Sequence, residues 1–344
     1  MSVSGETHSG RLTAVVLRHG TTALATSLLL LATAPAAAGA TFTTFDVNGA
    51  SATGALGINA GGEVTGDYKD SSGKDHGFVR AADGTITTFD PQGSIGTDPV
   101  SINRKGAITG FYHIDGSTYH GFLRSAGGKI TSFDANAPSQ TTALSINNAG
   151  SITGYYADAS GFLHGFIRAK NGTVTVFDPP GSTVTVSHGI NGNGDVTGYF
   201  DSSKLHGFLR NADGTITSFD VPGESQPYAQ AINSTDVIAG FAENGGNSSA
   251  TGFVRAADGT ITTFDPAGSI GTVPFSINRK GAITGSWSDS NGVEHGFVRS
   301  ATGKIKSFDP PGSTATEPFS INDNGLIAGF YSDSSGTHGF IRTP

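Results

Sequence analysis

The chain repeats one sequence pattern seven times, and this repetition limits the folds open to it more than any other feature. Each copy follows, with small variations, H-G-F-[hydrophobic]-R, a turn, T-[IV]-T-x-F-D, a Pro/Gly/Ser stretch, [SGA]-I-N, a Gly turn and [TA]-G-x-aromatic. The copies begin at His76, His120, His164, His206, Thr251, His295 and His338. The steps between them are 44, 44, 42, 45, 44 and 43 residues, a period typical of propeller blades and solenoid units.

Each copy contains four segments typical of short β-strands, which we call A to D and which Gly-rich turns separate. Around the first His the expected strands are Val100–Asn103 (A), Ala107–Tyr112 (B), His76–Arg80 (C) and Thr85–Phe89 (D). The A–B and C–D connections are short, whereas those at Asp90–Pro99 and His113–Tyr119 are predicted to be long. In a four-stranded antiparallel unit, like connections emerge on one side, so we expect a long-loop face and a short-turn face.

The two ends of the repeat region complete each other. The region begins with a lone D strand, Thr41–Asp46, and ends with a lone C strand, His338–Arg342. Pairing of these strands would close the array and remove its exposed sheet edges. The sequence therefore predicts an all-β, seven-bladed β-propeller of four-stranded repeats, closed by its N- and C-terminal strands. An open β-solenoid is the disfavoured alternative.

Residues 1–40 lie outside the repeats and have the composition of a secretory signal peptide. Arg11 and Arg18 precede an apolar run from Ala23 to Ala34, and small residues offer cleavage after Ala38 or Ala40. A membrane anchor is the alternative, but the run is shorter than the ~20 residues that span a bilayer. We expect residues 41–344 to be a secreted, periplasmic or extracellular propeller domain, monomeric and without a transmembrane segment. The chain has no cysteine, which excludes thiol catalysis.

One family carries a similar pattern. The segments His164–Arg168, Ser145–Asn147 and Gly150–Gly154 resemble the HAF-type bacterial extracellular repeats, which have an H-A-F core and an A-I-N-x-x-G-x-[IV]-x-G segment. The resemblance covers residues 41–342, with Gly in place of Ala after the His. It implies a secreted repeat protein and no particular activity. A fainter similarity links Gly84–Phe89 to streptogramin-lyase-type propellers, without that family's catalytic His and Glu pattern.

The repeated histidines are the first candidates for chemistry. Pairing Arg80 with Thr85 would put His76 opposite Phe89 and beside Asp90, so each His is expected to bond an Asp. A catalytic site needs one such pair rather than a ring of them. A metal site needs several ligands at one point, whereas each blade supplies only one His and one Asp. We therefore predict structural His and Asp residues and no catalytic or metal-binding residue. The predicted structural positions are His76, Asp90, His120, Asp134, His164, Asp178, His206, Asp220, His295, Asp309, His338 and Asp46.

Aromatic residues and charges distinguish the two faces. Acidic residues flank the strand ends of the long-loop face, whereas basic residues flank the short-turn face. Aromatic rings beside carboxylates and amides suit sugar recognition, so one ring per B strand is a candidate ligand contact. These candidates are Tyr68, Tyr112, Tyr156, Phe200, Trp287 and Tyr331. An arginine ring on the short-turn face is an alternative contact for anionic envelope polymers: Arg80, Arg124, Arg168, Arg210, Arg255, Arg299 and Arg342.

These features favour a secreted, non-enzymatic propeller that binds a polar extracellular ligand, such as a glycan or envelope polymer, through its acidic, aromatic long-loop face. A hydrolase or lyase acting at the central channel is the first alternative, and a structural envelope protein without a small ligand is the second. The chain contains no H-E-x-x-H motif, phosphate loop or nucleotide fingerprint, so no cofactor is expected. The acidic face also disfavours nucleic acid as a partner.

Overall fold

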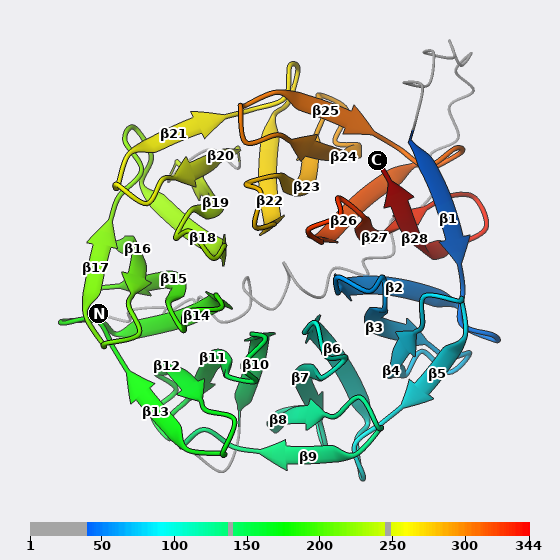
Figure 1. Ribbon diagram of the computed structural model, residues 1–344, viewed down its shortest axis with the longest axis horizontal. Coiled ribbons are helices and arrows are strands. Elements are labelled where there is room, and N and C mark those ends of the chain that lie inside the picture. Colours follow the sequence, from blue (N-terminus) through cyan, green and yellow to red (C-terminus); the bar gives the residue numbers. More distant parts are fainter. Residues whose placement is uncertain (1–39, 137–139, 245–248) are drawn as a thin grey trace, which may run out of the picture. The chain divides into compact units, whose positions relative to one another are not determined.

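The computed structural model describes residues 40–136, 140–244 and 249–344, and these residues form a closed ring of seven four-stranded blades (Figure 1). In each blade the strands run antiparallel and follow one another from the axis of the ring to its rim (Figure 1). The prediction of an all-β, seven-bladed β-propeller is confirmed. No helix in the described part of the chain has the length and apolarity needed to span a membrane.

The A and B strands form the inner half of each blade. The A strands are β2 (Ala52–Ile58), β6 (Gly96–Ile102), β10 (Thr141–Ile146), β14 (Val184–Ile190), β18 (Gln226–Ile232), β22 (Gly271–Ile277) and β26 (Ala315–Ile321). The B strands are β3 (Val64–Lys69), β7 (Ile108–His113), β11 (Ile152–Ala157), β15 (Val196–Asp201), β19 (Ile238–Glu243), β23 (Ile283–Ser288) and β27 (Ile327–Ser332). Successive A strands contact one another around the whole ring, so their side chains lie nearest the axis.

The C and D strands form the outer half. The C strands are β4 (Asp75–Arg80), β8 (Tyr119–Arg124), β12 (Leu163–Arg168), β16 (Leu205–Arg210), β20 (Ala250–Arg255), β24 (Glu294–Arg299) and β28 (Thr337–Thr343). The D strands are β5 (Ile86–Phe89), β9 (Ile130–Phe133), β13 (Val174–Phe177), β17 (Ile216–Phe219), β21 (Ile261–Phe264), β25 (Ile305–Phe308) and β1 (Thr41–Phe45).

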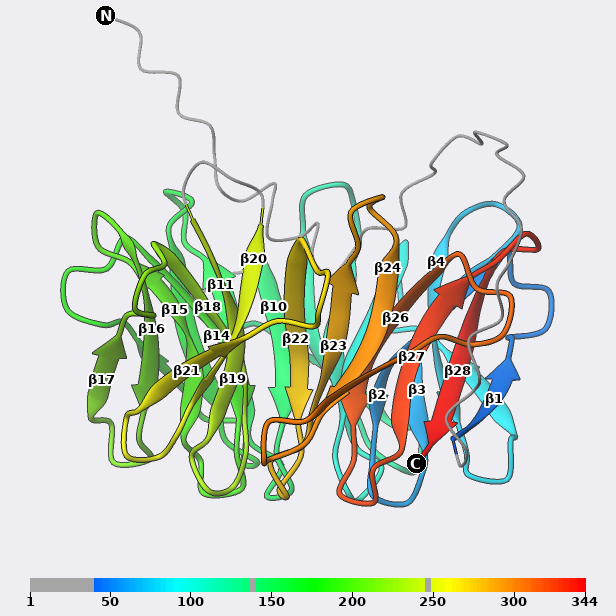
Figure 2. The same cartoon turned by 90° about the horizontal axis from the view of Figure 1, so that it is seen from above.

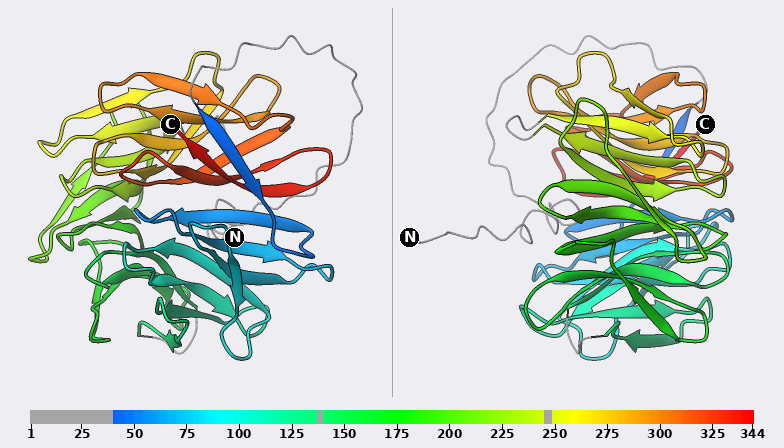
Figure 3. Two further views of the ribbon diagram at one scale, coloured as in Figure 1. Left: turned by 45° about the vertical axis from the view of Figure 1, so that its right-hand side comes forward. Right: turned by 90° about the vertical axis from the view of Figure 1, so that its left-hand side faces the viewer.

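The first and last strands close the ring as the sequence predicted. β1 pairs antiparallel with β28, from Thr41 opposite Thr343 to Phe45 opposite Gly339 (Figure 3). The N-terminal strand is thus the D strand of the seventh blade, whose other three strands come from the C-terminal end of the chain. The seventh blade thereby has four strands, like the other six.

Strand A begins earlier than the sequence indicated. β6 starts at Gly96 rather than Val100, because Pro99 can occupy the innermost strand, where its missing N–H needs no partner on the axial side. β7 extends to His113 and β8 begins at Tyr119, so the predicted long B–C loop is a short hairpin. The D–A and B–C connections nevertheless share one side of the ring, the upper side in Figure 2, and we keep the name long-loop face for it.

The C–D hairpin is shifted by one residue from the predicted register. Arg80 pairs with Ile86 rather than Thr85, and Gly77 rather than the preceding residue lies opposite Phe89. The turn between the strands holds one more residue than we expected, because Thr85 closes it through a backbone hydrogen bond instead of pairing in the strand. The same register recurs in the other blades.

Every A strand carries a β-bulge, which the sequence did not predict. In β6, for example, the register shifts between Pro99 and Ser101, so Val100 has no partner across the strand pair. Bulges re-aim side chains, and here each blade presents one such residue on its innermost strand. The seven bulge residues are Leu56, Val100, Leu144, His188, Gln230, Phe275 and Phe319.

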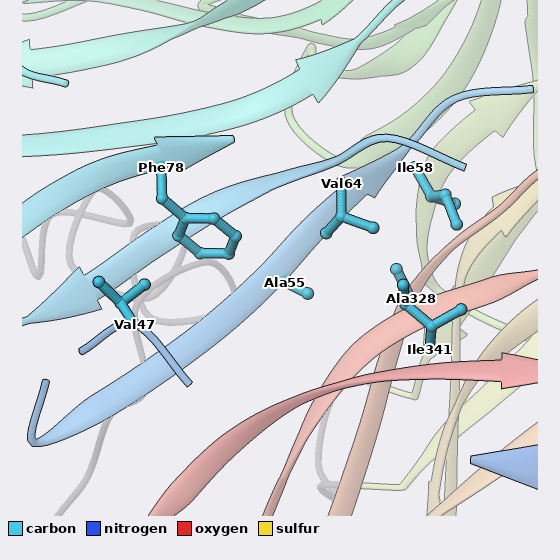
Figure 4. Close-up of a cluster of buried hydrophobic side chains, with 7 residues drawn as sticks. All are labelled: Val47, Ala55, Ile58, Val64, Phe78, Ala328 and Ile341. Carbon is cyan, nitrogen blue, oxygen red and sulfur yellow. The ribbon is translucent and has the colours of Figure 1, made fainter. Parts of the chain in front are cut away.

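The core lies between the blades. The Phe of each H-G-F segment, or of T-G-F in the fifth blade, is fully buried and meets the D-strand Phe of the preceding blade edge-on, with ring centroids 5.9 to 6.3 Å apart. Phe78, for instance, contacts Phe45 and joins a cluster with Val64 and Ile341 of the neighbouring blade (Figure 4). Each such ring contributes about 1.5–3 kcal/mol by burial, so interleaved Phe residues hold the blades together.

Candidate functional site

The six repeated histidines each bond the Asp that follows the D strand of the same blade. The imidazole Nδ1 lies 2.6 to 3.0 Å from a carboxylate oxygen in all six blades that have the His. In three of them a second Asp, from the B–C hairpin, lies 3.3 to 3.4 Å from Nε2. In a fourth, the Asp289 carboxylate lies 3.8 Å from the Nε2 of His295. The predicted His–Asp hydrogen bonds are therefore present, and four of the six histidines lie between two carboxylates.

The six candidate ligand-binding rings stack on these same histidines. The ring centroids of Tyr68, Tyr112, Tyr156, Phe200, Trp287 and Tyr331 lie 4.6 to 5.4 Å from those of their histidines. Four of the rings are only 4% to 7% exposed. Two sets that the sequence treated separately thus form one repeated unit of Asp, His and aromatic ring. The fifth blade has Thr251 and Ala242 at these positions and lacks the unit.

Neighbouring carboxylates favour the charged form of the histidine in two of these units. Burial opposes the charged form of His164, but Asp178 and Asp158 together outweigh it and raise the pKa of the imidazole. The same balance, with Asp46 and Asp333, raises the pKa of His338. Among the described residues, no group of three or more His, Cys, Asp or Glu side chains has the arrangement of a metal site.

A second set of aromatic rings, which sequence reasoning missed, lies closer to the axis. Phe275 and Phe319, the bulge residues of two adjacent blades, stack with centroids 4.5 Å apart, and Phe319 stacks on Phe330 at 5.4 Å. Tyr228 stacks on Phe241 at 4.8 Å as a separate pair on the A and B strands of the preceding, fifth blade. We call these five residues the axial aromatic cluster. All come from the A and B strands of the fifth to seventh blades.

Carboxyl groups lie on the inner strands of the seventh, first and second blades. Glu317 is the strand partner of Phe330, and burial together with the charge of Glu294 raises its pKa to about 7. Asp67 and Asp98 are 4% and 2% exposed, and burial raises the pKa of both. Asp98 accepts a hydrogen bond from His113, whose Nε2 is 3.1 Å away. The inner strands of the ring therefore carry both aromatic rings and carboxyl groups whose pKa values are raised by burial.

Two unpaired polar atoms lie beside the cluster. The Tyr199 hydroxyl and the His188 Nε2 are buried and have no hydrogen-bond partner among the described residues, and the two rings are neighbours at 5.7 Å. Burial lowers the pKa of His188 to about 4, so its imidazole is neutral near pH 7. The Tyr199 ring also meets Tyr228 edge-on at 5.0 Å. Polar groups and rings thus alternate around this part of the axis.

The arginine ring of the short-turn face has a structural contact that the sequence did not reveal. Each guanidinium lies over the D-strand Phe of the preceding blade, 4.7 to 5.2 Å from the ring centroid. Four of the seven, Arg124, Arg168, Arg255 and Arg342, are less than 10% exposed. Cation–π contacts of this kind link adjacent blades and leave little of these guanidinium groups open to an anionic polymer.

No protein-family model matches the chain, and no curated protein is detectably similar to it. Solved structures share its fold. Virginiamycin B lyase from Staphylococcus aureus, solved with quinupristin, is 15% identical with a TM-score of 0.63, over 89% of this chain and 100% of that one. An oligogalacturonate lyase in complex with manganese is 13% identical with a TM-score of 0.55, over 88% and 96%. The BP39L lectin from Burkholderia pseudomallei is 11% identical with a TM-score of 0.53, over 85% and 95%.

Proposed function

We propose that this propeller is a secreted, non-enzymatic binding protein that holds a polar extracellular ligand, a glycan, at the inner end of its long-loop face. The observation that carries the proposal is the axial aromatic cluster, a local departure from seven-fold repetition. Rings next to carboxyl groups can pack against the C–H face of a sugar while the polar groups bond its hydroxyls. The solved lectin with the same fold supports the proposal by analogy.

The structure changes where we place the ligand contacts. The six B-strand rings chosen from the sequence have one face against a histidine, and four of them are almost fully buried. Phe275 and Phe319 instead lie on the innermost strands and are half-buried. Phe241 and Phe330 are as buried as those four rings, at 4% and 7% exposure. We therefore assign the principal ligand contacts to Phe275 and Phe319 and a supporting role to the rings stacked on histidine.

The test is a glycan array probed with the protein and two variants. Replacing Phe275 by Val and Phe319 by Leu copies the bulge residues of the second and third blades, so the fold should be retained. We expect this variant to lose most of the binding. Charge reversal at Arg104 and Lys105, on the short-turn face, is the matched control and should leave binding unchanged. Equal binding by all three proteins would refute the assignment, and no binding by any would favour a structural envelope protein.

A hydrolase or lyase acting at the axis is the second candidate. One observation favours it: a carboxyl group that titrates near neutrality, as Glu317 does, is typical of a general acid or base. Two lyases also share the fold. Release of shorter products from a bound glycan would support this candidate, provided that Glu317→Gln abolishes turnover and preserves binding.

Membership of the HAF-type extracellular repeat family, and with it export from the cell, is part of the same proposal. The predicted signal peptide lies outside the described residues. One structural feature explains why this chain has Gly where those repeats have Ala. A methyl group at Gly121 would lie 2.7 Å from the ring of Phe133, so the packing of the D-strand Phe requires Gly after the His. Secretion assays with and without residues 1–40 would test export.

A further inference from the structure

Two arginine side chains from distant blades meet at one carboxylate on the short-turn face. Arg104 lies in the A–B turn of the second blade and Arg279 in that of the sixth. They are equivalent residues of the stretches 76–110 and 251–285, which are identical at all but four positions. The Oδ2 of Asp323, in the A–B turn of the seventh blade, lies 3.4 Å from the Nη2 of Arg104 and 3.8 Å from the Nε of Arg279. Its Oδ1 accepts the backbone N–H of Arg279 at 3.0 Å.

This contact lies beside the axis of the ring and is open to solvent. The second and seventh blades are separated by the first, so Arg104 reaches past the first blade to contact Asp323, which is possible only close to the axis. The first blade leaves room for this reach, because Ala60 holds the position equivalent to Arg104. The side chains of Arg104 and Arg279 are 55% and 62% exposed. A ligand can therefore reach both guanidinium groups without a rearrangement of the fold.

The protein balances only part of the positive charge at this place. Exposed Lys105 and Lys280 follow the two arginines in their turns, and neither forms an ion pair with a described residue. All seven A–B turns lie in the described part of the chain, and among their carboxylates only that of Asp323 contacts a cationic side chain. The other three accept hydrogen bonds from Asn59 or Asn191 instead: Glu63, Asp195 and Asp236. One carboxylate thus faces two guanidinium groups, each with a lysine next to it.

We propose that the short-turn face binds a phosphate or sulfate group at the axis, between Arg104 and Arg279. Both arginines contact the same carboxylate oxygen, so one tetrahedral anion can reach both. Such an anion offers each guanidinium group a pair of oxygen atoms for parallel charge-assisted hydrogen bonds. Asp323 is then an internal competitor that occupies part of the site in the free protein. The site is separate from the proposed glycan site, which lies on the long-loop face.

The test is calorimetric titration of the protein with inorganic phosphate and with sulfate at low ionic strength, where exposed charges are least screened. We expect Arg104→Gln and Arg279→Gln each to weaken binding at least about tenfold, because each removes charge-assisted hydrogen bonds. Asp323→Asn should instead strengthen binding about threefold or more, since it removes the competing charge. Lys129→Gln and Lys304→Gln remove exposed cations from the C–D turns of the same face. They are the matched controls and should change binding less than about twofold.

Three results would overturn the inference. The first is no binding of either anion. The second is an equal loss in the arginine and lysine variants, which would show general attraction to a basic face rather than a site. The third is weaker binding by Asp323→Asn, which would show that the aspartate positions the arginines and does not compete with the ligand.

A further titration distinguishes the sources of the anion. If long-chain polyphosphate binds more tightly than inorganic phosphate at the same concentration of phosphate groups, the ligand is a polymer; equal binding assigns the site to the free anion. Both results support the site, provided that Arg104→Gln weakens them. Glycan binding should be unchanged in every variant, so this inference and the proposed function can fail separately.

Discussion

The side-chain Nδ2 of Asn322 donates a hydrogen bond to the backbone carbonyl of Asn59, 2.9 Å away, and so joins the last A–B turn to the first. The same bond links every pair of successive blades, at 2.9 to 3.3 Å, and together the seven bonds form a closed ring near the axis on the short-turn face. The Oδ1 of each Asn accepts two backbone N–H groups of its own turn, as for Asn324 and Leu326 at Asn322. Each Asn therefore holds its own turn and also links it to the next blade.

Replacing Asn322 by Ala should destabilise the whole ring. The change removes the bond to the Asn59 carbonyl, which keeps only the backbone N–H of Gly62, and leaves two backbone N–H groups of the turn without their acceptor. We expect a loss of about 2–3 kcal/mol in the free energy of unfolding, measured by urea denaturation. Asn324→Ala is the control, since its bond to the Ala60 carbonyl is exposed, and should cost less than about 1 kcal/mol. Equal effects of the two changes would contradict a special role for the ring.

The pairing of β1 with β28 leads to a second prediction. Deleting Gly339 to Pro344 removes all five strand partners of β1, including the fully buried Phe340. The melting temperature should fall by at least about 10 °C, because a lost core Phe alone costs about 3–5 kcal/mol. Deleting only Thr343 and Pro344 is the control and should change it little. An unchanged melting temperature in the longer deletion would argue against closure of the ring by these strands.

The repeat was enough to predict the ring, its closure and the His–Asp bonds. These depend on features visible in one copy and repeated in all: strand residues, turn glycines and the fixed distance between His and Asp. The start of strand A was missed because Asp98 and Pro99 resemble a loop. Pro is tolerated there only because the strand is innermost, which a single copy does not show.

The axial aromatic cluster could not be predicted by the same reasoning. Its members occupy positions that vary between copies, and the bulge decides that Phe275 and Phe319 lie side by side. A bulge depends on the twist and pairing of the whole blade, so it leaves no local sequence signature. One signal was available, namely the substitution of Phe275 for Val100 between two otherwise nearly identical stretches.

The His–Asp units should make stability depend on pH. The pKa of His164 is raised above 6.5 in the folded protein, so its contribution is complete below that pH and is lost as the pH rises through the raised value. The pKa of Asp158 is lowered from 3.8, so its contribution is lost only as the pH falls below that value. His164→Ala should therefore cost about 1–3 kcal/mol near pH 5 and less near pH 9. Chemical denaturation at the two pH values measures this difference.

The fifth blade supplies the control for this experiment. Thr251→Ala changes the equivalent position in the blade without the His, and its effect should be the same at both pH values. A pH-independent cost of His164→Ala would show that the ring stacking on Tyr156, rather than charge, accounts for the contribution of the His. A loss of ligand binding in a stable His164→Ala protein would contradict its structural assignment.

We expect Asp236, in the A–B turn of the fifth blade, to destabilise the folded protein. Asp236 has a φ of 59°, in the left-handed region where the other six blades have Gly. Burial and the charge of Asp195 raise its pKa, and the Asn191 Nδ2 donates to both carboxylates, at 2.8 and 3.0 Å. A carboxyl group whose pKa is raised on folding destabilises the folded state above its ordinary pKa.

Asp236→Gly should therefore raise the free energy of unfolding by about 1 kcal/mol at neutral pH, because it removes both the strained backbone and the like charge. The gain should shrink near pH 4, where protonation of Asp236 already relieves the repulsion. Asp236→Asn, which keeps the side chain and removes the charge, should recover only part of it. Calorimetric melting of the three proteins at both pH values measures each contribution. If the Gly variant is less stable, the hydrogen bond from Asn191 to Asp236 contributes more than the backbone strain and the repulsion from Asp195 cost together.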